Sequence, residues 1–270
     1  MKSPILMLLS LLLAVCATYQ AAHAAERRYT NEDEARRWRA VGILRVGEGM
    51  CSGSLIAPDL VLTVAHCVAN AKERTQLVPS QVVFYAGWRN GDALARRRAS
   101  KIGVHPGYFA TGARYTEKQV RVDVAYVRLA APIAGDVAPH FDMSYTPRVG
   151  SAVALLSYAG GRWSKLSVQA PCRIIERKTE FLRTDCLSQP GASGSPIVET
   201  GADGVERVVG LNTGLQRVDG EQTGLGLSLA HVRDWLSTSL TGVAPPTPEV
   251  VQRIKPGGVG NSAGFKRVKP

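Results

Sequence analysis

Between residues 40 and 240, short runs of Val, Ile, Leu and Tyr alternate with Gly, Pro, Asn and Asp, and almost no stretch keeps a helical period. This pattern is typical of an all-β protein. The strands that we expect are 40–46, 52–57, 60–64, 81–86, 99–105, 123–129, 152–158, 165–175, 181–184, 196–199, 205–211 and 224–228. A dozen short strands at close spacing favour two six-stranded antiparallel barrels over a single barrel.

A stretch rich in proline and glycine, residues 131–150, interrupts the strand pattern and suggests where one barrel gives way to the other. We therefore place an N-terminal barrel at 40–140 and a C-terminal barrel at 141–243. The second barrel should end in a helix over 228–240, which opens with a serine able to cap it. Its apolar side chains recur on one face, at Leu229, Val232, Trp235 and Leu236.

The two ends of the chain differ from this globular region. Lys2, an apolar run over 5–15 and the small-x-small string at 22–24 predict a signal peptide at 1–24, cleaved near Ala24. A membrane anchor is the alternative, but the run is shorter than the roughly 20 residues that span a bilayer. We expect a secreted or periplasmic protein without a transmembrane segment. Residues 25–39 form an N-terminal extension, and the basic, proline-rich 244–270 should be a disordered tail.

The formal net charge of the chain is +11, and removal of the signal peptide leaves +10 because only Lys2 is lost. Such a charge favours contacts with anionic surfaces, although a solvated basic face would account for it equally well. Nothing indicates a specific nucleic-acid partner, and we expect a monomer.

Four cysteines remain in the mature chain, and an even number in an exported protein predicts two disulfides. Three pairings are possible. The cysteines fall into two short-range pairs, one in each half of the chain, so we expect Cys51–Cys67 and Cys172–Cys186. A zinc site is the alternative, but neither pair has the tight ligand spacing of a structural site.

Three short segments carry candidate chemistry. Ser193 lies between two glycines in a Gly-Ala-Ser-Gly-Ser-Pro string, His66 follows an apolar strand directly, and Asp123 opens another strand. A hydroxyl nucleophile needs a base, a carboxylate that orients the base, and donors for the developing oxyanion. The backbone N–H groups of Gly191 and Ser193 could be those donors. Each residue alone has an ordinary explanation as a turn or strand-end residue.

Taken together, these segments resemble the three signature motifs of trypsin/chymotrypsin-like serine proteases, in the order His, Asp, Ser. They read Thr63-Val-Ala-His66-Cys67, Asp123-Val-Ala and Gly191-x-Ser193-Gly-x-Pro196. The resemblance implies paired barrels with the active site in the cleft between them, a catalytic triad of His66, Asp123 and Ser193, and a protein or peptide substrate. It implies no metal or other cofactor.

The chain departs from this family at two places. Ala192 stands where trypsin has the aspartate that pairs with a new N-terminal amine, so we expect no activation by cleavage after Arg39. Leu187 stands at trypsin's cation-binding position, which disfavours cleavage after Lys or Arg. Bacterial glutamyl endopeptidases share the Gly-x-Ser-Gly-Ser-Pro string but have a His where this chain has Asn212. With Thr213, that region is more similar to periplasmic quality-control proteases, so a small or apolar P1 residue is expected.

Two other functions compete with this interpretation. An α/β-hydrolase esterase would need Gly-x-Ser-x-Gly and a histidine after the serine, but residue 195 is Ser, and His231 is the sole downstream candidate. A cationic binding protein that keeps the protease fold is suggested by the basic run 96–98 and the basic tail. The complete set of three catalytic residues favours the enzyme.

Overall fold

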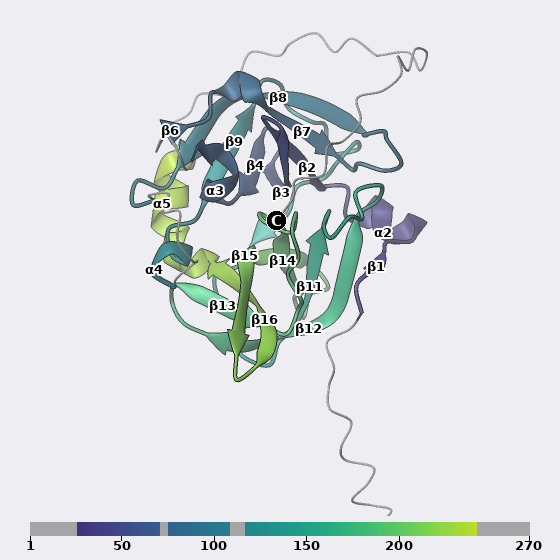
Figure 1. Ribbon diagram of the computed structural model, residues 1–270. Coiled ribbons are helices and arrows are strands. Elements are labelled where there is room, and N and C mark those ends of the chain that lie inside the picture. Colours follow the sequence, from purple (N-terminus) through teal and green to yellow (C-terminus); the bar gives the residue numbers. More distant parts are fainter. Residues whose placement is uncertain (1–25, 71–74, 109–116, 242–270) are drawn as a thin grey trace, which may run out of the picture.

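A computed structural model describes residues 26–70, 75–108 and 117–241 of the chain (Figure 1). The expected signal peptide at 1–24 and the expected tail at 244–270 lie outside these residues. The described chain is built mostly of strands, which form two barrels that lie one above the other in Figure 1. Within the described ranges, no helix has the length and apolar composition that a membrane crossing requires.

The first barrel is closed by six antiparallel strands in the order β2-β3-β4-β9-β8-β7. Alternate side chains of these strands point inward, so Leu44, Leu62, Phe84 and Val127 are fully buried. The strands are β2 (Val41–Val46), β3 (Gly49–Ala57), β4 (Leu60–Thr63), β7 (Val82–Ala86), β8 (Ala95–Val104) and β9 (Ala125–Leu129). Two short strands, β5 (Ala69–Asn70) and β6 (Thr75–Gln76), pair with each other outside it.

The second barrel follows the order β12-β11-β14-β15-β16-β13 and closes because β13 also pairs with β12. Its strands are β11 (Ala152–Ser157), β12 (Ser167–Arg177), β13 (Phe181–Thr184), β14 (Pro196–Thr200), β15 (Glu206–Val218) and β16 (Glu221–Ser228). A short strand, β10 (Asp142–Met143), pairs parallel with β15. The predicted fold of two six-stranded antiparallel barrels is confirmed.

The terminal helix α5 (Leu229–Thr241) follows β16 directly, which confirms the helix predicted from the apolar spacing. It lies along the side of both barrels in Figure 1. Leu229, Val232 and Leu236 are buried, while the Trp235 ring lies 5.2 Å from the ring of His105 in the first barrel. The helix therefore holds the two barrels together on one side. Three further helical segments of the barrels are short: α3 (Ala65–Val68), α4 (Glu117–Val120) and the 3₁₀ turn η1 (Pro79–Gln81).

The N-terminal extension contains a strand and a helix of its own. Its strand β1 (Arg28–Tyr29) pairs with β12, and its helix α2 (Glu32–Arg37) begins with a capping box formed by Asn31 and Glu34. Trp38 is 6% exposed, and its indole N–H donates to the Glu206 carboxylate. The extension thus packs against the second barrel, and Figure 1 shows α2 and β1 beside β12.

Several strand limits differ from the predicted ones. β8 begins at Ala95 instead of residue 99, because the basic run 96–98 pairs with β7 despite its lack of apolar alternation. β15 continues to Val218 because it forms a long hairpin with β16. β9 begins at Ala125, so Asp123 precedes the strand and does not lie in it.

Candidate active site

His66 lies in a single helical turn that follows the buried strand β4. β4 ends at Thr63 and α3 begins at Ala65, so the chain turns sharply at this end of the first barrel. Cys67 forms a disulfide with Cys51 of β3, with a Cα–Cα distance of 6.2 Å. This bond fixes the turn against the neighbouring strand. The His66 side chain keeps 24% of its surface exposed, which leaves the ring accessible.

Asp123 comes from a different part of the first barrel and contacts His66 twice. Its Oδ2 lies 2.8 Å from Nδ1 of the imidazole, and its Oδ1 accepts a hydrogen bond from the His66 backbone N–H at 2.9 Å. The Asp123 side chain is fully buried. A carboxylate held at both oxygens fixes the ring orientation and favours the tautomer with the proton on Nδ1, which leaves Nε2 to accept a proton.

Ser193 lies in the loop that precedes β14 of the second barrel, and backbone contacts attach this loop to the first barrel. The carbonyl of Ser193 accepts from the N–H of Ser52 at 2.9 Å, and the carbonyl of Ser52 accepts from Oγ1 of Thr63 at 3.0 Å. Ser52 adjoins Cys51, whose disulfide partner Cys67 adjoins His66. The serine loop and the histidine turn therefore share one anchor.

The Ser193–His66 link itself is not closed in this structure. Among the described residues, Ser193 Oγ takes part in no hydrogen bond. Catalytic hydrogen bonds often become short and well aligned only when substrate is bound. The structure therefore brings the histidine and the aspartate into contact and places the serine on an adjoining loop.

The glycines around Ser193 have conformations that other residues rarely adopt. Gly191 has φ +94° and Gly194 has φ +77°. A Cβ on Gly194 would overlap the Ser52 carbonyl and Oγ1 of Thr63, and one on Gly191 would overlap the ring of Trp163. In the described part of the chain, the N–H groups of Gly191 and Ser193 donate to no protein acceptor. Both N–H groups are therefore available as the two donors that an oxyanion hole requires.

The residues predicted to bind substrate lie in different environments. The Leu187 side chain is 41% exposed, whereas Asn212 and Thr213 are 2% and 3% exposed. Asn212 Nδ2 donates to Ser188 Oγ and to the Ala192 carbonyl, and Thr213 Oγ1 donates to the Leu225 carbonyl. A substrate-binding role for these three residues stays a prediction.

Ser188 escaped notice in the sequence, although it lies five residues before Ser193 and its hydroxyl contacts Asn212 at 2.9 Å. Trp163 was missed as well, because nothing in the chain near it indicates that its ring covers Gly191. Trp163 contacts the serine loop from a segment distant in sequence, and Ser188 contacts Asn212, which is distant in sequence as well. Local motifs do not record such contacts.

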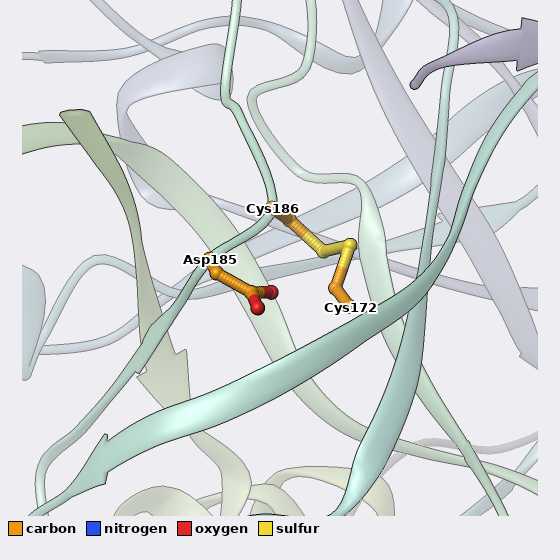
Figure 2. Close-up of side chains that lie close together, drawn as sticks. All are labelled: Cys172, Asp185 and Cys186. Atoms are coloured by element: carbon orange, nitrogen blue, oxygen red, sulfur yellow. A yellow bond between two sulfur atoms is a disulfide. The ribbon is translucent and has the colours of Figure 1, made fainter. Parts of the chain in front are cut away.

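The second disulfide lies at the start of the serine loop. Cys172 of β12 bonds to Cys186 with a Cα–Cα distance of 5.3 Å, and Figure 2 shows the Asp185 carboxylate beside the bonded sulfurs. These three residues are close enough to suggest a metal site. Sulfurs joined in a disulfide are not thiolate ligands, however, and Asp185 Oδ1 accepts from the backbone N–H of Arg173 at 2.6 Å. The cluster is thus explained by the disulfide, which holds the serine loop to β12.

Known proteins resemble this chain in sequence and in fold. A trypsin-like protease of Streptomyces glaucescens is 28% identical over 124 residues, which is 46% of this chain and 41% of the relative. A glutamyl endopeptidase of Bacillus licheniformis is 24% identical over 178 residues, or 64% of this chain and 53% of the relative. The chain therefore spans about half the length of these curated relatives or less.

A solved structure of a Glu endopeptidase has the same fold, with a TM-score of 0.67 and 18% identity, covering 80% of this chain and 97% of that one. The family described as the trypsin-like peptidase domain matches residues 51–211, which include the His66, Asp123 and Ser193 segments. Because this match extends over more than half of the chain, the protein belongs to the trypsin-like peptidase family.

Proposed function

We propose that this protein is an exported serine endopeptidase in which Ser193, His66 and Asp123 form the catalytic triad. One observation carries the proposal: the buried Asp123 carboxylate holds both the ring and the backbone of His66, at 2.8 Å and 2.9 Å. The backbone contact fixes the carboxylate, and the fixed carboxylate in turn fixes the orientation of the ring. Holding the ring by Nδ1 directs Nε2 outward as a base.

The reaction follows from these positions. Ser193 Oγ bonds to the scissile carbonyl carbon while its proton passes to Nε2 of His66, and the carbonyl oxygen becomes an oxyanion. The free N–H groups of Gly191 and Ser193 stabilise that oxyanion. The C–N bond then breaks as His66 returns the proton to the leaving amine. Water then hydrolyses the acyl-enzyme. His66 takes a proton from the water as its oxygen bonds to the acyl carbon, and the bond to Ser193 Oγ breaks as His66 returns the proton to that oxygen.

The proposed specificity is for substrates with a small or apolar side chain at P1, the residue before the scissile bond. Leu187 places no carboxylate where a P1 Lys or Arg would need one, and Asn212 supplies no cationic group for a P1 Glu. The glutamyl endopeptidase relative motivates the acidic alternative. A fluorogenic peptide library varied at P1 separates the two. Preferred cleavage after Ala or Val supports the proposal, and preferred cleavage after Glu replaces it.

Activity should not require cleavage after Arg39. The following residue, Ala40, is 2% exposed, and Arg39 itself donates to the Asp136 carbonyl, so the bond between them is poorly accessible. A new amine at Ala40 would also find no carboxylate at Ala192. Export is proposed from the predicted signal peptide and from the two disulfides.

The test is labelling of the mature chain, uncut at Arg39, with an active-site fluorophosphonate. We expect stoichiometric attachment, mapped to Ser193 by peptide mass spectrometry, and no attachment to the Ser193→Ala variant. Labelling that appears only after cleavage at Arg39 would refute activity without a zymogen switch. If neither the uncut chain nor the chain cut at Arg39 is labelled, the proposal that the protein is a serine endopeptidase is refuted.

A cationic binding protein on the same fold is the second candidate, because Arg96 and Arg98 are exposed on β8. In that case Ser193→Ala would keep full biological activity, and binding to polyanions would weaken with salt.

A further inference from the structure

The turn that carries the two oxyanion donors is held at nearly every peptide group. In the Pro190–Gly191 peptide, the carbonyl of Pro190 accepts from the N–H of Gly160 at 2.9 Å, and the N–H of Gly191 donates to no acceptor among the described residues. In the next peptide, the Gly191 carbonyl accepts from Ser52 Oγ at 3.2 Å and the Ala192 N–H donates to the Gln189 carbonyl at 2.9 Å. Both planes are therefore fixed from outside the turn.

The Ala192–Ser193 peptide carries the second free donor, and a side chain of β15 holds its other end. The Ala192 carbonyl accepts from Asn212 Nδ2 at 3.0 Å and from the Ser195 N–H at 3.0 Å. A peptide group is planar, so a fixed carbonyl also fixes the direction of the N–H on the opposite side. Asn212 is 2% exposed, and its second amide proton goes to Ser188 Oγ at 2.9 Å. Both N–H groups of the Asn212 side-chain amide thus donate hydrogen bonds within the protein.

Ser52, on β3 of the first barrel, also holds carbonyl groups of the turn. It is fully buried, its backbone N–H donates to the Ser193 carbonyl at 2.9 Å, and its hydroxyl donates to the Gly191 carbonyl. The same hydroxyl accepts from the Tyr158 N–H at 3.1 Å, which fixes the direction of its own proton. One residue therefore holds two carbonyls of the turn, those of Gly191 and Ser193, on either side of the Ala192 carbonyl that Asn212 holds.

Residue 192 has a methyl side chain that is 1% exposed, so no ion pair can order this turn through it. Resting on the function proposed above, we propose that Asn212 of the second barrel and Ser52 of the first are positioning residues that keep the oxyanion turn assembled, in place of a charged switch. Asn212 orients the Ser193 N–H through the Ala192 carbonyl. Ser52 orients the Gly191–Ala192 plane through the Gly191 carbonyl. Neither side chain needs to touch the substrate.

The experiment compares two variants with a matched control. Asn212→Asp keeps the size of the side chain but removes the donor to the Ala192 carbonyl and places an acceptor there. Ser52→Ala removes the buried hydroxyl. Ser54→Ala is the control, because Ser54 is also fully buried on β3 and its hydroxyl has no hydrogen-bond partner among the described residues. Each purified protein is assayed for kcat, KM, fluorophosphonate labelling rate and melting temperature.

We expect Asn212→Asp to lower kcat about 100-fold and Ser52→Ala about 10-fold, since misplaced donors lose transition-state stabilisation without weakening ground-state binding. Labelling rates should fall by similar factors, because the phosphonate adduct also places a negative oxygen in the hole. KM should change less than about threefold, and Ser54→Ala should match the unmodified enzyme.

Three results would overturn the proposal. The first is a kcat for Asn212→Asp within about twofold of the unmodified enzyme. The second is a loss confined to KM, which would make Asn212 a substrate-binding residue. The third is a loss of activity that follows the melting temperature or is shared by Ser54→Ala. If the unmodified protein is not labelled by the fluorophosphonate and does not cleave peptides, the proposed function fails. This outcome differs from the three above, in which the unmodified protein is active and only the positioning role fails.

Discussion

Replacing Asp123 by Asn tests the base–carboxylate pair most directly. The carboxylate accepts two hydrogen bonds, from the ring and from the backbone of His66. An asparagine side chain has one oxygen, so it can serve only one of them. If the oxygen faces the backbone N–H, the amide NH₂ faces Nδ1 and forces the ring proton onto Nε2. If the oxygen faces the ring, the NH₂ opposes the backbone N–H in a fully buried site, which costs about 1–3 kcal/mol.

The first orientation should therefore dominate, and with the proton on Nε2 His66 no longer accepts the proton of Ser193. The expected loss in kcat is about 10⁴-fold. At 1.36 kcal/mol for each factor of ten, this loss corresponds to about 5 kcal/mol of barrier height. KM should stay within about threefold, because Asp123 is fully buried and therefore not accessible to a substrate.

The assay is continuous hydrolysis of a fluorogenic peptide near neutral pH, with Ser193→Ala as the baseline and a thermal melt of each protein. Asparagine removes a buried charge while keeping the shape of the side chain, so the melting temperature should fall little. A kcat within about tenfold of the unmodified enzyme would refute the assignment of Asp123. A drop in activity that merely tracked unfolding would also refute it.

Three further predictions concern the turn, the second disulfide and pH. Gly194→Ala should lower kcat/KM at least about 100-fold, because φ is +77° and a Cβ would overlap the Ser52 carbonyl; activity within about tenfold in the peptide assay would contradict this reasoning. Replacing Cys172 and Cys186 together by Ala should lower the free energy of unfolding in urea by about 3 kcal/mol, and a loss below about 1 kcal/mol would show that the bridge constrains little. Burial lowers the pKa of His105 from its ordinary value of 6.5, so below that pH the unfolded chain binds more protons and stability should fall as pH drops. In thermal melts from pH 7 to 5, His105→Asn should reduce the dependence of the melting temperature on pH. An unchanged dependence would refute the assignment of this pH effect to His105.

The sequence by itself determined the features that depend on neighbours along the chain. Strand periodicity gave the all-β class, and the spacing of Leu229, Val232 and Leu236 gave the terminal helix, because each pattern repeats with the geometry of its element. The short separations of the cysteines indicated both disulfides. The strings around His66, Asp123 and Ser193 indicated the family, since each is a short run of neighbouring residues.

The tertiary structure decided what depends on barrel closure and strand register. His66 and Asp123 are 57 positions apart, and the sequence between them does not indicate their contact, which arises because β4 pairs with β9. A substrate-binding role for Asn212 stays a prediction, but its contact with the Ala192 carbonyl depends on its place on β15 and could not be predicted from the sequence. Local patterns set the direction of a side chain relative to its own strand. Only the packing of strands distant in sequence sets what that side chain meets.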